Sequence, residues 1–249
     1  MTKFSVIIPT FNEEQKIQHC IKSIHESVAD VEVIVVDGGS LDGTISIAEQ
    51  EGAVVCRSDL GRGKQSNAGV GIASGDVLLI LHADTLLPPN AFELLQVSFQ
   101  DVNVQIGTFR LGFDVQHPIL RLYTLFTRCD SVFTRFGDQC IVLRRSFFEI
   151  IGGFPEWPLF EDVRMLQNAR KRTHIFSFPA QVTTSARRFL KHGIIWQQLR
   201  NAWYLTLYLL GFSPVRLAMK YERGSNNQTG AVSSPMLSRE LPGASHTKT

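Results

Sequence analysis

The segment Val31-Glu-Val-Ile-Val-Val-Asp37-Gly-Gly-Ser-Leu-Asp42-Gly43-Thr44 carries the strongest structural signal in this chain. Its β-branched run predicts a buried strand that ends at Asp37. The glycine-rich turn that follows leads into a helix, for which Asp42 and Thr44 are suitable first residues. A polar side chain at the carboxyl end of a buried parallel strand faces the crevice where α/β sheets bind ligands. We therefore expect Asp37 to lie at a site for a polar ligand, in particular a nucleotide.

Strands and helices alternate on both sides of this segment. Strands are predicted at 4–9, 32–36, 53–56 and 77–81, and helices at 13–27, 42–51, about 62–73 and after 88–90. This order predicts an α/β fold with a mainly parallel sheet and helices on both faces. After residue 105 the rhythm changes to a more mixed sheet. Strands are expected there at 106–113 and 139–143, and helices at 119–126, 146–151 and 161–172.

Composition restricts the class of protein. The chain has 249 residues, of which 44% are hydrophobic and 19% charged, so a packed core is expected. The four cysteines (Cys20, Cys56, Cys129 and Cys140) form no C-x-x-C pair, which favours thiols in a reducing compartment over zinc or disulfides. The first residues lack the pattern of a signal peptide. A cytoplasmic protein is expected, with contact to the inner face of the membrane as a further hypothesis.

The charge distribution is asymmetric. Residues 1–120 contain 7 Lys/Arg and 15 Asp/Glu, a net charge of −8, whereas residues 121–223 contain 16 and 7, a net charge of +9. Either the halves attract each other within one fold, or the second half faces an anionic acceptor or membrane. The apolar run Ala202–Phe212 is shorter than the ~20 residues that span a bilayer. A helix at 194–212, with Trp196 and Trp203 on one face, either packs on the domain or lies at a membrane interface.

Polar groups follow four of the predicted strands. Asp37 is placed to accept a hydrogen bond from a base, while Arg62 and Lys64 suit a diphosphate. Asp84 follows the strand 77–81, where one carboxylate and two phosphate oxygens would hold Mg²⁺ or Mn²⁺. Single residues have structural alternatives: Asn12 as a helix cap, and Lys64 as a solvated lysine.

A pair of carboxylates, Glu161 and Asp162, follows a Gly-Pro-rich loop at the start of a predicted helix. The pair either matches the charge of the helix N-terminus or supplies a general base. The segment Gly61-Arg-Gly63-Lys64 does not fit a Walker A loop, and neither G-x-G-x-x-G after a strand nor G-x-S-x-G occurs. A Rossmann dehydrogenase and a serine hydrolase are therefore disfavoured.

Five sequence blocks, taken in order, resemble family-2 glycosyltransferases of the GT-A fold. The resemblance extends over about residues 4–215. The blocks are Val6-Ile-Ile-Pro9-Thr10-Phe11-Asn12-Glu13-Glu14, Val36-Asp37-Gly38-Gly39-Ser40-Leu41-Asp42-Gly43-Thr44, Gly63-Lys64-Gln65-Ser66-Asn67-Ala68-Gly69, His82-Ala83-Asp84-Thr85, and Gly152-Gly153-Phe154 with Glu161-Asp162.

The resemblance implies an inverting, hexosyltransferase-like enzyme that uses a nucleotide-sugar donor, usually a UDP-sugar. Asp84 would bind a divalent cation (Mg²⁺ or Mn²⁺), and Asp162 would be the general base with Glu161 beside it. His82 departs from the family pattern, because the first metal carboxylate is missing, so the diphosphate would hold more of the cation. The residues implied to bind the nucleotide are Pro9, Thr10, Asn12, Glu13, Asp37, Gly39, Arg62, Lys64 and Asn67.

The C-terminal half resembles a compact bacterial subgroup labelled arsenosugar-biosynthesis or radical-SAM-associated glycosyltransferases. In that comparison Asp138, Arg187 and Arg188 are acceptor-side or phosphate-side residues. The expected organisation is a nucleotide-sugar-binding half (1–115), an acceptor and catalytic half (116–223) and a disordered tail (224–249).

The expected partners are a nucleotide-sugar donor and a hydroxyl-bearing acceptor, either a small metabolite or a lipid, and no nucleic acid. The oligomeric state is left open. Two other functions remain as alternatives: nucleotidylyl transfer onto a sugar phosphate, and nucleotide-sugar binding without catalysis.

Overall fold

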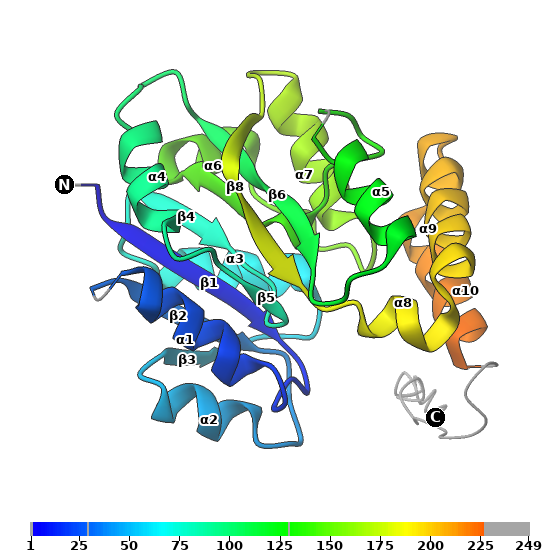
Figure 1. The fold of residues 1–249 in the computed structure, drawn as a ribbon, viewed down its shortest axis with the longest axis horizontal. Coiled ribbons are helices and arrows are strands. Elements are labelled where there is room, and N and C mark those ends of the chain that lie inside the picture. The colour runs from blue at the N-terminus through cyan, green and yellow to red at the C-terminus, as the bar shows by residue number, and fades with distance from the viewer. Residues whose placement is uncertain (1, 29, 129, 227–249) are drawn as a thin grey trace, which may run out of the picture.

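The computed structural model describes residues 2–28, 30–128 and 130–226 (Figure 1). Its centre is a sheet with the strand order β3-β2-β1-β4-β7-β6-β8-β5. The strands are β1 (Phe4–Thr10), β2 (Glu32–Asp37), β3 (Val54–Arg57), β4 (Val77–Ile80), β5 (Thr85–Leu86), β6 (Ile106–Phe113), β7 (Ile141–Arg144) and β8 (Phe176–Thr184). The helices are α1 (Ile17–Ser27), α2 (Thr44–Gln50), α3 (Arg62–Ile72), α4 (Ala91–Ser98), α5 (Pro118–Phe126), α6 (Arg145–Ile151), α7 (Glu161–Arg170), α8 (Arg187–His192), α9 (Ile194–Leu209) and α10 (Pro214–Asn226), with a 3₁₀ turn at Gly137–Gln139.

The sheet confirms the predicted fold class. Strands β3, β2, β1 and β4 are parallel neighbours, whereas β7 runs antiparallel to both β4 and β6. The parallel part therefore continues into a mixed part without a break between the two expected halves of the chain. The register sets Thr10 opposite Asp37, and Asp37 opposite Arg57. The polar ends of β1, β2 and β3 consequently meet at one edge of the sheet.

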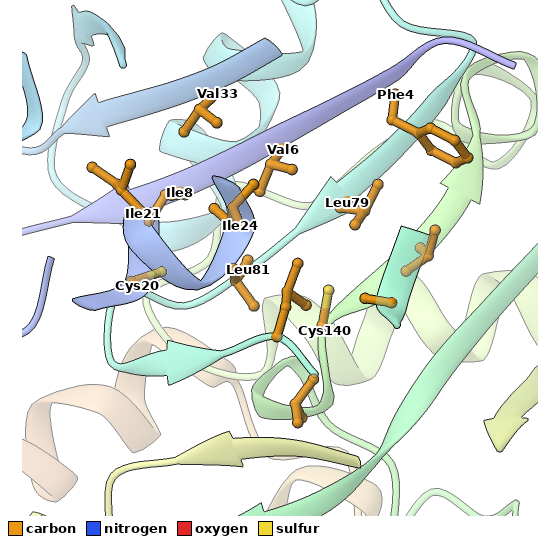
Figure 2. Close-up of a cluster of buried hydrophobic side chains, with 14 of the residues drawn as sticks. Phe4, Val6, Ile8, Cys20, Ile21, Ile24, Val33, Leu79, Leu81 and Cys140 are labelled. Atoms are coloured by element: carbon orange, nitrogen blue, oxygen red, sulfur yellow. The ribbon is translucent and has the colours of Figure 1, made fainter. Parts of the chain in front are cut away.

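Alternate residues of the strands pack into two hydrophobic layers. On one face, Val6, Ile8 and Leu79 pack against α1, α2 and α4. Figure 2 shows the part of this layer in which Cys20, Ile21 and Ile24 of α1 lie over the strands. On the other face, Ile7, Val36 and Ile80 pack against α3, α6 and α7. This two-sided burial explains why the strand sequences are continuously apolar.

Several boundaries differ from the prediction. Helix α1 begins at Ile17 rather than Glu13, because the N–H groups of Glu13 and Glu14 donate to Thr44 Oγ1 (2.8 Å) and Asp42 Oδ2 (3.3 Å). These two hydrogen bonds join the loop after β1 to the loop after β2. Strands β5 and β8 were not predicted from the sequence. Helix α10 runs to Asn226, so residues 224–226 are helical, and the rest of the expected tail (227–249) lies outside the described residues.

Helices α8, α9 and α10 lie at one end of the molecule, beside α5 (Figure 1). In the described ranges, no helix combines the length and apolar character needed to cross a bilayer. The thiols of Cys20 and Cys140 are free and buried, and the thiol of Cys56 is free and half-buried, while Cys129 lies outside the described residues.

Candidate functional site

The loop after β2 is organised by Asp37. Its fully buried carboxylate accepts hydrogen bonds from the backbone N–H groups of Gly39 (2.8 Å) and Ser40 (3.0 Å). Gly39 has φ of +96°, a left-handed conformation that favours glycine. Asp37 thus shapes this loop directly, and its role toward a nucleotide stays a prediction.

The loop after β1 is joined to the same structure through Asn12. This residue has φ of +53°; its N–H donates to Ser40 Oγ (2.8 Å) and its Oδ1 accepts from the N–H of Leu41 (2.9 Å). Gln65 of α3, which sequence reasoning missed, donates through Nε2 to the carbonyls of Thr10 and Val36 (both 2.7 Å). A polar residue on the buried side of a helix is the only sequence signal for it. The ends of β1 and β2 are consequently held as one unit.

Asp84 lies beside two groups that are distant in sequence. One oxygen is 3.7 Å from the guanidinium of Arg187, which also pairs with Glu13 in the loop after β1. The second oxygen of Glu13, Oε2, is buried and has no hydrogen-bond partner among the described residues. Strand β8 brings Arg187 here, because Thr184 pairs with Thr85 directly after Asp84. Arg187, predicted to be an acceptor-side or phosphate-side residue, therefore lies between Glu13 and Asp84.

Carboxylates gather where α7 begins. Asp162 accepts from the N–H of Gly137 through Oδ2 (2.6 Å) and from that of Val163 through Oδ1 (2.7 Å), which fixes its orientation. Burial, and next the charge of Asp162, raises the pKa of Asp138 to about 7, and the same two causes raise the pKa of Glu161. The Oδ1 atom of Asp138 is buried without a hydrogen-bond partner among the described residues. Asp138 therefore carries a proton more readily than an ordinary aspartic acid does.

Arg62, the first residue of α3, connects these groups electrostatically. Its charge opposes the rise in pKa of both Asp138 and Glu161. Burial, followed by the charges of Arg62 and Arg188, lowers the pKa of His82 well below its ordinary value, so His82 is neutral. Arg62 therefore lies within electrostatic reach of the loop after β4, of α7 and of α8.

Tyr123 of α5 is a further residue that sequence reasoning missed. Burial raises the pKa of its phenol, and the charges of Asp138 and Asp162 add to the shift. Its place in an aromatic-rich helix gave no indication that it borders the carboxylates.

Two predicted nucleotide-binding residues are engaged elsewhere. Lys64 pairs with the exposed Asp59 (2.9 Å). Asn67 exchanges hydrogen bonds with the backbone of Phe154: its Nδ2 donates to the carbonyl (2.8 Å), and its Oδ1 accepts from the N–H (3.0 Å). Asn67 thereby positions the loop before α7. Pro9 lies within β1, at the residue before Thr10.

The residues at Asp84 can hold a divalent cation only with help from a ligand. Within residues 2–28, 30–128 and 130–226, no three His, Cys, Asp or Glu side chains are grouped so as to bind a metal by themselves. The His82 side chain is turned toward Gly137, because a Cβ on that glycine would lie 3.1 Å from His82 Nε2. Asp84 therefore offers one carboxylate, a pattern that suits Mg²⁺ or Mn²⁺ when two phosphates supply other ligands.

The raised pKa of Asp138 makes folding stability depend on pH. Its pKa is about 7 in the folded protein against an ordinary 3.8, so the free energy of unfolding should fall as the pH rises from about 4 to about 7. The asparagine in Asp138→Asn cannot ionise, so the free energy of unfolding of this variant should not show this decrease between about pH 4 and about pH 7. Urea unfolding of both proteins between about pH 5 and about pH 8 should show the gap between them changing by a few kcal/mol. A pH-independent gap would contradict the prediction.

Comparison with known proteins identifies the family. Residues 5–150, more than half of the chain, match Glycosyl transferase family 2. The chain belongs to this family. The transferase is also 33% identical, over 201 residues and 72% of each chain, to a PGL/p-HBAD biosynthesis glycosyltransferase of Mycobacterium tuberculosis. These matches confirm the resemblance to family-2 glycosyltransferases seen in the five sequence blocks. The protein is therefore a glycosyltransferase that uses nucleotide-sugar donors.

Two further comparisons are more distant. The transferase is 30% identical over 122 residues to the undecaprenyl-phosphate 4-deoxy-4-formamido-L-arabinose transferase of Proteus mirabilis, covering 44% of this chain and 37% of that one. Its fold matches glucosyl-3-phosphoglycerate synthase from Mycobacterium tuberculosis, solved with Mn²⁺, UDP and glucosyl-3-phosphoglycerate. The TM-score is 0.53 with 22% identity, over 74% of this chain and 70% of that one. This structural match confirms the GT-A fold.

Proposed function

We propose that this glycosyltransferase moves a hexose, with inversion, from a UDP-sugar to the hydroxyl of a small metabolite or lipid. The single observation that carries the proposal is that α3 begins, at Arg62 and Gly63, directly against Glu161: a Cβ on Gly63 would lie 3.4 Å from Cβ of Glu161. The charge of Arg62 also affects the pKa values of His82, Asp138 and Glu161. A diphosphate beside Arg62 would therefore lie between the nucleotide loops and the carboxylates. That is the arrangement an in-line transfer of a sugar needs.

The donor's base and ribose are assigned to the paired loops after β1 and β2. Asp37 and Asn12 hold these loops in one conformation before a ligand arrives, which lowers the cost of ordering them on binding. The structural neighbour with UDP supports the choice of nucleotide. Gly39 leaves room for a close approach of the ribose to the backbone, since no atom lies within 4 Å of the position of a Cβ.

Positive charge on the donor side would stabilise the departing diphosphate. Arg187 lies at Asp84, and burial, followed by the charge of the nearby Arg62, lowers the pKa of Arg188. A divalent cation bound by Asp84 and the two phosphates would supply further positive charge. These charges act more strongly on the transition state, because negative charge grows on the diphosphate as the glycosidic bond breaks.

Asp162 is assigned as the general base, with Glu161 beside it. The backbone N–H groups of Gly137 and Val163 aim its carboxylate, which would take the acceptor's proton during attack. Asp138, held partly protonated by burial, can donate to an acceptor or sugar oxygen through its otherwise unpaired Oδ1. The phenol of Tyr123 borders the same space.

The proposal predicts cation-dependent turnover. Purified protein incubated with single UDP-sugars should release UDP with Mg²⁺ or Mn²⁺ present, and EDTA should lower the rate at least about tenfold. Asp84→Asn should cause a similar loss and should respond little to added metal. Asp76→Asn is the matched control, because Asp76 is exposed and precedes the opposite end of the same strand, β4.

Different products would contradict it. Release of pyrophosphate on incubation with a sugar phosphate and UTP would identify a nucleotidylyltransferase. UDP-sugar binding without UDP release, with a broad acceptor panel included, would identify a binding protein. If EDTA left the rate of UDP release unchanged in the wild type and in Asp84→Asn, the nearby arginines would neutralise the diphosphate without a cation. The arsenosugar subgroup remains a prediction, and so does the hexose.

A further inference from the structure

Helix α9 faces solvent with its apolar side. Trp196 and Trp203 are 56% and 62% exposed, while Gln197 is buried and donates to Asn201 Oδ1 (2.7 Å) and Tyr221 Oη (3.1 Å). The buried residues of α9 are Gln197 and Leu205, so this helix leaves most of its large apolar side chains exposed, whereas an ordinary surface helix buries its apolar stripe. The exposed apolar residues of α9 recur at spacings of one, three or four, so that they lie along one side of the helix: Ile195, Trp196, Leu199 and Trp203.

Neighbouring elements extend this surface. Figure 1 shows α5 next to α9, and a groove of about 290 Å³ between their first turns is lined by His117, Ile119, Ile195 and Trp196. We define the apolar face as the four exposed apolar residues that share one side of α9: Ile195, Trp196, Leu199 and Trp203. Other large apolar side chains are exposed on the neighbouring elements: Leu122, Leu125 and Phe126 of α5, Leu210 and Phe212 after α9, and Val215 and Met219 of α10. Monomeric soluble proteins rarely expose two tryptophans, a leucine and an isoleucine together on one side of a helix.

Basic residues predominate around the apolar face. Residues 186–226, which run to the end of α10, contain seven Lys/Arg and one acidic residue, Glu222. On α5, Arg121 is exposed, and Arg128 is exposed just after that helix. A second copy of the chain docked here would bring two basic surfaces together, which disfavours a symmetric dimer. An anionic lipid surface instead matches both features, because tryptophans enter the headgroup region while lysines and arginines pair with phosphates.

We infer that the apolar face docks this transferase onto an anionic bilayer, with α9 lying in the interface and without crossing it. Helix α8 connects this face directly to the site, because it begins with Arg187 and Arg188. The docked enzyme therefore presents its site next to the headgroups. This inference rests on the proposed function, and it implies that the acceptor hydroxyl belongs to a membrane lipid.

Vesicle flotation tests the docking without any nucleotide or acceptor. The full chain should float with vesicles of phosphatidylcholine and phosphatidylglycerol, bind pure phosphatidylcholine much less, and be released by high salt. Its tryptophan emission should shift to the blue on binding. Trp196→Glu/Trp203→Glu should lower the bound fraction at least about tenfold, since it removes two anchors and adds two repelled charges.

The matched control is Val97→Glu/Val102→Glu, which adds the same charges at valines that are 67% and 72% exposed on and just after α4. This control should bind vesicles as the wild type does, and all three proteins should bind UDP equally. No binding of the wild type to anionic vesicles would overturn the docking. A dimer in light scattering that the tryptophan variant dissolves would instead assign the face to a second copy. If the protein bound vesicles only after residues 227–249 were removed, the occupant of the apolar face would be that C-terminal segment. Loss of UDP binding in every protein would overturn the donor site and leave the docking intact.

Discussion

Asp162→Asn is expected to lower UDP release from the UDP-sugar by about 10²- to 10⁴-fold, the usual effect of removing a general base. The amide keeps the shape of the carboxylate and cannot accept the proton of a water or acceptor hydroxyl. Its NH₂ group faces one of the two N–H donors, Gly137 or Val163, so stability should also fall by about 1 kcal/mol. Initial rates at saturating donor measure the first effect, and thermal unfolding measures the second.

Measuring UDP binding distinguishes the loss of a general base from the loss of the donor site. Asp162→Asn should bind UDP as tightly as the wild type, because the proposed nucleotide site is formed by the loops after β1 and β2, away from α7. Glu161→Gln, a change of the same kind at the adjacent residue, should reduce the rate less, since Glu161 is buried and its raised pKa makes it a poorer carboxylate at neutral pH. Equal rates in Asp162→Asn and the wild type would refute the assignment of the base.

Gly63→Ala is expected to destabilise the protein by about 1–3 kcal/mol and to reduce turnover as well. A Cβ at Gly63 would lie 2.3 Å from the carbonyl oxygen of Pro155 and 3.4 Å from Cβ of Glu161. The backbone oxygen cannot move aside as a flexible side chain can. The methyl group should therefore push α3, which carries Arg62, away from the loop that leads to Glu161. Urea unfolding and the UDP-release rate both report the change.

Gly71→Ala provides the matched control in the same helix. A Cβ at Gly71 meets no other atom within 4 Å, so alanine should stabilise α3 by about 0.5–1 kcal/mol through its better helix propensity. Opposite signs for the two substitutions are expected. If Gly63→Ala were as stable and active as Gly71→Ala, the close contact between α3 and the Pro155 loop would not exist in solution.

Local patterns carried most of the fold. The first four strands were predicted from short continuous apolar runs, because the sheet is covered on both of its faces, and α1 was predicted from apolar residues at spacings of three and four. Asp37 and Asp84 were found because each directly follows such a strand. The two missed strands have weaker patterns: β5 has only two residues, and β8 contains a proline and mixes buried with exposed positions. Their pairing with each other joins residues about 100 positions apart in sequence.

The sequence by itself determined the family, the sheet with its strand-end carboxylates, and the Glu161–Asp162 pair, because these depend on short-range periodicity and on contiguous motifs. Only the tertiary structure decided which side chains meet. It brought Arg187 to Glu13, 174 residues away, and turned the amide of Asn67 toward Phe154. It also left the tryptophans of α9 uncovered, although the same helical spacing suits a buried face. Long-range pairing and packing decide such contacts, because a helix's apolar stripe does not specify what will cover it.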